Sequence, residues 1–195
     1  MIHGMAFGIQ YVMKAPYRFA ALLFISTACN SSFTGGKESN TAGLISQAIP
    51  TQDDASFLVD AACGQMLEVA LSKIAIQKAD NPRIRELGEM LVKVHSQSID
   101  DIRKLAAAKR LRLPASLSPK QQEVMEALMA KNGPDFDQSF IGWTMRDHKK
   151  DIRAFQVESE KGRDSEIRDF ADGSLSFLDL SLDSAQNIQY DLSRK

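Results

Sequence analysis

From residue 53 to the end of the chain, apolar residues recur at spacings of three and four, and no stretch alternates with a period of two. Such spacing is typical of amphipathic helices, which bury one stripe of side chains. Glycine and proline are scarce except at a few positions where helices are expected to begin or end. The spacing therefore predicts an all-α fold.

Capping residues divide this part of the chain into four long helices and one short helix. We expect long helices over about 53–79, 82–110 and 135–161, and a fourth that follows Asp164 and keeps its apolar stripe as far as Ile188. A short helix begins at Ser118, where Gln121 is placed to complete a capping box. Four amphipathic helices of similar length predict a four-helix bundle over residues 53–190, with the short helix between the second and third long ones.

The lengths of the connections limit the order in which the helices pack. The first and second long helices, and the third and fourth, are joined by two or three residues, so each pair forms an antiparallel hairpin. The middle connection, from Leu111 to Pro134, has about 24 residues. It can either turn back or travel the length of the bundle. We favour the long crossover over the up-and-down order.

The N-terminal part predicts export and lipidation. Met13-Lys14-Ala15-Pro16-Tyr17-Arg18 is followed by the apolar run 19–25 and by Ser26-Thr27-Ala28-Cys29. A basic head, a short apolar run and small residues before a cysteine indicate a signal peptide over residues 1–28, whose true start can be Met13. The run is shorter than the roughly 20 residues of a membrane span. Because a cysteine follows the small residues, the segment resembles a bacterial lipoprotein signal that places the lipid on Cys29.

Residues 29–52 predict a lipid-anchored flexible linker, since they are rich in Ser, Thr, Gly and Asn. Removing Lys14 and Arg18 with the signal changes the formal net charge from −1 to −3. A net acidic chain makes nucleic acid an improbable partner. Cys63 is then the only thiol left, so no internal disulfide can form and the fold depends on its apolar core. We expect an anchored, periplasm-facing protein of the cell envelope, at the outer membrane.

Ligand-type side chains lie on the apolar stripes of three different helices. Glu68, His95 and His148 fall within about 3 Å of their helix midpoints at 1.5 Å of rise per residue, so they share one central layer. Ser181 lies on the flank of the last stripe, and Asp147 precedes His148. We interpret this layer first as a charge-assisted hydrogen-bond network that fixes helix register. The alternative is one divalent metal ion bound by the three residues, with water or Asp147 completing the shell.

Several kinds of chemistry are disfavoured by the sequence. A di-iron bundle needs Glu-x-x-His on two helices, and no Glu-x-x-His occurs in the chain. Cys63 has no activating base nearby in the sequence, and no Gly-x-Ser-x-Gly elbow is present. We therefore predict no catalytic residue and a protein that is not an enzyme.

Two surface features allow a functional and a structural interpretation. Trp143, with Phe136, Phe140 and Ile141, forms either part of the core, which we favour, or a face for an unknown protein partner. The cations at the end of the second helix can touch anionic lipid, although a charged helix end is usually only solvated. These cations are Arg103, Lys104, Lys109, Arg110 and Arg112.

Several short motifs over residues 53–188 resemble a bacterial exported family known as domain of unknown function 4142. They are Asp53-Asp54-Ala55-Ser56-Phe57, Ala61-Ala62, Glu68-Val69, Met90-Leu91-Val92-Lys93-Val94-His95, Phe136-Asp137 and Arg146-Asp147-His148. The resemblance implies a ferritin-like helical bundle, an envelope or outer-membrane location and no settled activity. The family typically has Asp-His where this chain has Val94-His95, and a further histidine and a proline where it has Ser181 and Ser176.

Overall fold

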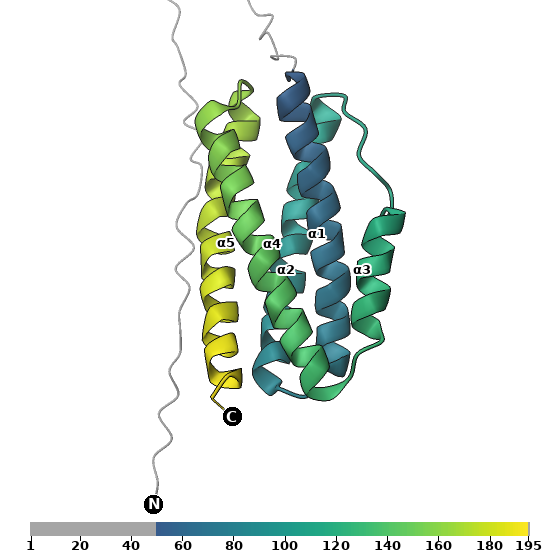
Figure 1. Cartoon of the computed structure of the whole chain (residues 1–195). Helices are drawn as coiled ribbons and strands as arrows, with labels where there is room; N and C mark the ends of the chain where they lie inside the picture. The colour runs from purple at the N-terminus through teal and green to yellow at the C-terminus, as the bar shows by residue number, and fades with distance from the viewer. Residues whose placement is uncertain (1–49, 195) are drawn as a thin grey trace, which may run out of the picture. The chain divides into compact units, whose positions relative to one another are not determined.

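A computed structural model describes residues 50–194, and this part is entirely helical (Figure 1). The expected export signal, the lipidated Cys29 and most of the linker lie outside the described residues. Five helices follow in order, α1 (Gln52–Lys78), α2 (Pro82–Ala108), α3 (Pro119–Met129), α4 (Gly133–Lys161) and α5 (Ser165–Leu192). The predicted helix content and order are confirmed, with helix ends that differ by one or two residues.

The helix ends follow from local capping. Ser118 and Gln121 form the expected capping box at the start of α3, and Asp164 accepts from two backbone amides at the start of α5. Helix α1 begins one residue earlier than predicted because Thr51 caps it with a second capping box. Helix α4 begins two residues earlier, at Gly133, whose φ of +54° suits a residue without a side chain.

The long helices form two antiparallel pairs, α1 with α2 and α4 with α5, as their short connections require. Helices α2 and α4 run in the same direction, because the segment that joins them returns along the whole bundle (Figure 1). Helix α3 forms part of this return and packs beside α1. The structure thus has the long crossover that the sequence analysis favoured.

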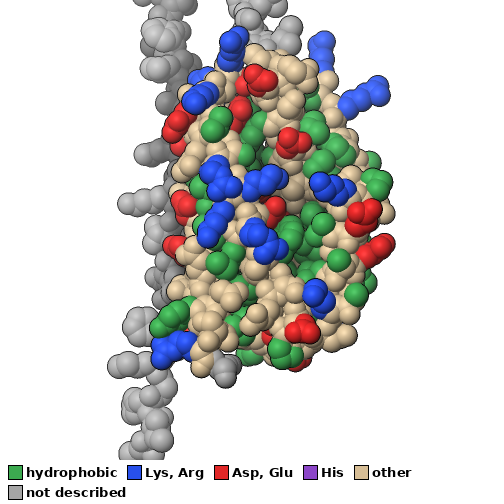
Figure 2. Space-filling view, viewed as in Figure 1, with side chains coloured by type: hydrophobic (Ala, Val, Ile, Leu, Met, Phe, Trp, Pro, Cys, Tyr) green, Lys and Arg blue, Asp and Glu red, His purple; other side chains and the backbone are tan. Residues whose placement is uncertain are grey.

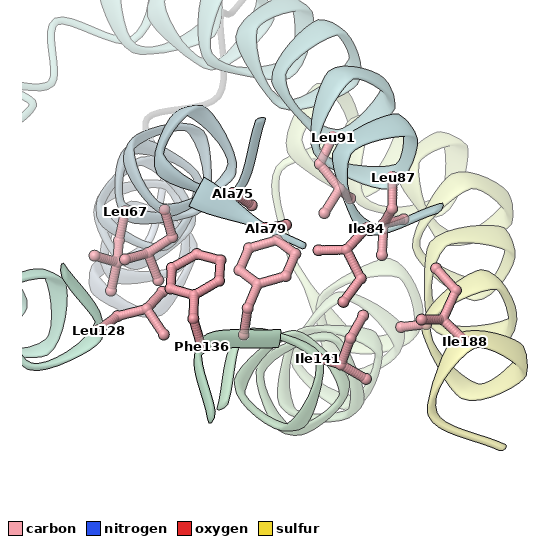
Figure 3. Close-up of a cluster of buried hydrophobic side chains, with 13 residues drawn as sticks. Leu67, Ala75, Ala79, Ile84, Leu87, Leu91, Leu128, Phe136, Ile141 and Ile188 are labelled. Carbon is pink, nitrogen blue, oxygen red and sulfur yellow. The ribbon is translucent and has the colours of Figure 1, made fainter. Parts of the chain in front are cut away.

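The apolar core consists of two clusters separated by polar side chains. One cluster fills the half of the bundle that contains the α1–α2 turn (Figure 3). The other fills the half that contains the α4–α5 turn. The largest fully buried apolar side chains are Phe136, Phe140, Phe155, Leu58, Leu71, Ile84, Leu91, Ile102, Ile141, Ile167 and Leu178. Both clusters are built from described residues alone, so this part of the chain contains its own core.

Helix α1 is the one helix among residues 50–194 that is long and apolar enough to span a membrane. Its buried face packs against α2 and α4, and it carries the buried acids Asp54 and Glu68. A helix of this length and composition is equally typical of a protein core, and here it forms part of one.

The α1–α2 turn is held by a buried carboxylate from α4. The oxygens of Asp137 accept from the backbone amides of Asp80, at 3.1 Å, and Asn81, at 2.9 Å. We expect Asp137→Ala to lower the free energy of unfolding by about 1–3 kcal/mol, since two part-buried backbone amides lose their acceptor. Urea denaturation followed by circular dichroism measures this loss. Asp135→Ala, at an exposed position of the same helix, serves as control, and equal losses in both variants would contradict the assignment.

Candidate functional site

Three helices bring one carboxylate and two imidazoles together between the two apolar clusters. Glu68 of α1, His95 of α2 and His148 of α4 are each at most 1% exposed. One ligand atom from each residue lies within 4.8 Å of the other two. The predicted central layer of these three residues is therefore confirmed.

The two oxygens of Glu68 face different histidines. Oε2 contacts Nε2 of His95, and Oε1 lies 3.0 Å from Nδ1 of His148. Neither contact has the geometry of a hydrogen bond, because the ring N–H directions do not point at the oxygens. Nδ1 of His148 instead lies 3.0 Å from the backbone oxygen of Thr144. A carbonyl only accepts, so this nitrogen carries a proton.

Five atoms of the cluster consequently lack a hydrogen-bond partner within residues 50–194. They are both oxygens of Glu68, both ring nitrogens of His95, and Nε2 of His148. Most buried polar atoms in proteins are hydrogen-bonded, and each exception calls for a physical reason. The cluster is therefore under-satisfied as a hydrogen-bond network.

Aromatic packing fixes the orientation of His95. Its ring meets the ring of His148 edge to face, at a centroid distance of 5.6 Å, and the ring of Phe177 at 5.1 Å. Phe177 comes from α5, which contributes no ligand-type side chain to the cluster. Ser181 lies one turn further along α5; it is buried, and its hydroxyl has no partner among the described residues.

Burial and charge act in opposite directions on these groups. Burial raises the pKa of Glu68, but the nearby His95 and His148 outweigh it and hold the pKa at about 2. Burial by itself lowers the pKa of His148. The Glu68 carboxylate raises it by more than burial lowers it, so the pKa of His148 lies above its usual value. An ionised Glu68 therefore favours the protonated form of His148.

Two further acids approach Glu68 from α4. Ligand atoms of Glu68, Asp147 and Asp151 also lie within 4.8 Å of one another. Burial, and then the Glu68 charge, raise the pKa of Asp147 to about 6. Burial, then Asp147 and Glu68, raise the pKa of Asp151 to about 7. The sequence analysis named Asp147 but missed Asp151, although Asp151 follows His148 by three residues and so shares its inward face.

A groove of about 500 Å³ between α1 and α4 leads toward the acidic side of the cluster. Asp151 lines it, together with Asp60, Glu158 and the cations Lys150 and Arg153. Asp151 therefore borders both the groove and the buried Glu68.

The other sequence candidates lie elsewhere. Cys63 is half-buried, and burial followed by the Asp60 charge raises the pKa of its thiol, which disfavours the reactive thiolate. Phe136, Phe140 and Ile141 are fully buried, as the favoured interpretation required. Trp143 is half-buried beside them.

The comparisons with known proteins agree with this architecture. Residues 40–188 match DUF4142, a domain of unknown function. The chain belongs to the DUF4142 family. This confirms the resemblance drawn from the short motifs. A search of curated proteins finds no match for this DUF4142 chain.

Three solved structures share the fold of this DUF4142 protein. A DUF305 fragment from Deinococcus radiodurans has a TM-score of 0.64 at 10% identity, over 76% of this chain and 100% of that one. A DUF305 protein of Streptomyces coelicolor, described as secreted, has a TM-score of 0.62 at 13% identity, over 72% and 94%. A conserved hypothetical protein of Mycobacterium tuberculosis, rv2844, has a TM-score of 0.54 at 17% identity, over 70% and 90%. At these identities the likeness concerns the fold alone.

Proposed function

We propose that this DUF4142 protein binds one divalent transition-metal ion in its bundle core, through Glu68, His95 and His148. The observation that carries the proposal is the convergence of three buried ligand groups, one from each of three helices, whose ligand atoms lie within 4.8 Å of one another. In a hydrogen-bond network each N–H is directed at its acceptor. The ligands of one metal ion instead direct their lone pairs at the ion. Their ligand atoms are then close to one another without forming hydrogen bonds.

The distances suit such an ion. Ligand atoms about 2.0–2.2 Å from a tetrahedral ion lie roughly 3.5 Å apart, so atoms already within 4.8 Å need little movement. When Nδ1 of His148 donates to the backbone oxygen of Thr144, Nε2 is the ring nitrogen that can bind an ion, after the release of any proton that it carries. Imidazole together with carboxylate suits zinc, copper, nickel or ferrous iron. Asp147, which is within reach of Glu68, can supply a fourth ligand.

The register network is the second interpretation of the same residues. The opposite charges of Glu68 and a protonated His148 favour it. It leaves five buried atoms without partners, however, and a half-satisfied network costs stability. A bound cation satisfies more of these atoms, so we prefer it.

The proposal includes a setting and a class of protein. We place the chain in the bacterial envelope, facing the periplasm at the outer membrane and held by a lipid at Cys29, because of its lipoprotein-like signal. We assign the bundle to the ferritin-like class, which the crossover between α2 and α4 supports. We propose binding rather than catalysis, since the described residues offer no activated nucleophile beside the cluster.

Metal analysis of the chain without its predicted export signal, purified without a polyhistidine tag, tests the proposal. After incubation with zinc, copper, nickel or ferrous ions and dialysis, we expect about one ion per chain for at least one metal. The His95→Ala, His148→Ala double variant is expected to lose it, because two of the three ligands are gone. Mass spectrometry of the eluted metal gives the stoichiometry.

Ser181→Ala is the matched control, because it removes a buried polar group of the same layer that is outside the ligand set. It should retain the ion. Circular dichroism checks that each variant is folded. If the parent chain binds no metal, or if the double variant binds as much as the parent, the register network becomes the better interpretation.

A further inference from the structure

Helix α4 separates its charges by sign along the stretch that supplies the buried cluster. Between residues 146 and 153 its acids and its histidine face inward or are half-buried. Its four cations are all exposed and follow the spacing of one helical face, namely Arg146, Lys149, Lys150 and Arg153. Figure 2 shows Lys and Arg side chains gathered over the middle of α4. We call these four residues the cationic ridge.

Within residues 50–194 the cationic ridge forms no ion pair, although the charge of Lys150 acts on the inward-facing Asp147 and Asp151. No carboxylate of residues 50–194 lies within 4.0 Å of any of its four charged groups, whereas other cations have such partners. Arg83 pairs with Asp191, for example. The exposed positions that continue the stretch, Ala154, Gln156 and Val157, carry no charge. Four unpaired positive charges therefore lie along about 10 Å of one helix.

Three of the five cations that the sequence analysis considered for lipid contact are paired with carboxylates. Lys109 is buried and bonds to Asp164 at 2.7 Å, and it also contacts Glu166. Arg103 and Lys104 pair with Asp100 and Asp101 on their own helix. These pairs leave fewer free cations at the end of α2 for an anionic lipid than the sequence alone indicates.

We propose that the cationic ridge docks the bundle on an anionic phospholipid bilayer, with α4 lying along the membrane surface. Charge complementarity carries the proposal, because each Lys or Arg near an anionic surface contributes attraction. This step rests on the proposed function, in which a lipid at Cys29 holds the bundle near the bilayer. A lipid chain and a polybasic face are two signals that together fix an orientation.

The docked orientation has a consequence for the buried cluster. Lys150 and Arg153 of the ridge also line the groove that contains Asp151. A bilayer held against the ridge therefore covers the opening that leads to the acidic side of Glu68. Docking and access to the cluster are coupled in this arrangement.

Vesicle binding tests the proposal on residues 45–195. This part contains both apolar clusters, and a Deinococcus chain matches the fold over its whole length, so it folds on its own. We expect it to co-sediment with phosphatidylcholine vesicles that contain phosphatidylglycerol, and not with phosphatidylcholine alone. High salt should abolish the binding because it screens the charges. Changing all four ridge residues to Gln should weaken binding about 100-fold.

Two further measurements locate the contact. The quadruple variant Lys73→Gln, Lys93→Gln, Arg112→Gln, Lys120→Gln removes the same charge from exposed positions elsewhere, and it should bind almost as well as the parent. Trp143, the only tryptophan, lies one turn before the ridge, so brominated phosphatidylglycerol should quench its fluorescence.

The proposal fails if both quadruple variants lose binding equally, or if neutral vesicles bind as well as anionic ones. It also fails if the ridge binds soluble polyglutamate but no vesicle, which would make it a face for an acidic polymer. These assays use no metal ion, so their failure leaves the metal proposal standing.

Discussion

Replacing Glu68 with alanine is expected to lower the free energy of unfolding by about 3–5 kcal/mol, because two buried imidazoles lose the carboxylate that contacts both of them. The measurement is urea denaturation at pH 7 without metal, followed by circular dichroism. Gln65→Ala is the control, since Gln65 is equally buried on the same helix but carries no charge. A loss below about 1 kcal/mol for Glu68→Ala would contradict the central position of this carboxylate.

Replacing the whole cluster separates stability from function. We expect the triple variant Glu68→Leu, His95→Leu, His148→Leu to be about as stable as the parent or more so, because burying charges costs free energy that apolar side chains avoid. Equal stability would mean that the three polar groups are not needed to hold the bundle together. That outcome would strengthen the metal proposal, whereas a triple variant as weak as Glu68→Ala would favour the register network.

The position of the cluster could be predicted because helical geometry alone determines it. Glu68, His95 and His148 each interrupt an apolar stripe close to the middle of a long helix. Packed helices of equal length bring their midpoints together, so three polar residues at mid-height must meet. The same reasoning placed Ser181 in the layer, where it is buried.

Other buried charges could not be predicted because the partner, rather than the local pattern, buries them. Asp151 lies among lysines and arginines, as a solvated face would. The Lys109 side chain is buried because it pairs with Asp164, which is 55 positions away in the printed sequence. The Asp137 side chain is buried because it accepts from the amides of the α1–α2 turn. The sequence also gives no account of ring orientation, so the missing hydrogen-bond alignment of the cluster became visible only in the structure.

The metal-free bundle should lose stability as pH rises from 5 to 8. Asp151 has its pKa raised from 3.8 to about 7, so the folded state holds a proton that the unfolded state releases between these values. The resulting stabilisation is present at low pH and is lost through this window, by up to about 4 kcal/mol. Asp147 and Glu158, with pKa values raised to about 6 and about 7, act in the same direction.

His148 adds to the loss of stability at rising pH, whereas Glu68 has the opposite effect at lower pH. The pKa of His148 is raised above 6.5, so its stabilisation is present below that pH and is lost as pH rises through the folded value. The pKa of Glu68 is lowered from 4.5 to about 2, so its stabilisation is lost as pH falls through that range. Maximum stability is therefore expected near pH 4, where the gain from Glu68 and the losses from Asp147, Asp151 and Glu158 balance.

Asp151→Asn isolates the largest contribution to this pH dependence. The amide keeps the shape of the side chain but cannot ionise, so the variant should approach the parent near pH 4, where Asp151 of the unfolded chain begins to ionise, and exceed its stability by a margin that grows up to about pH 7. Asp172→Asn, at an exposed position of α5, should follow the parent at every pH. Urea denaturation in the presence of a chelator, repeated from pH 4 to pH 8, gives the three curves. If the parent instead gains stability between pH 5 and 8, then Asp151 is ionised in the folded bundle, and the inward face of α4 holds a negative charge at neutral pH even without metal.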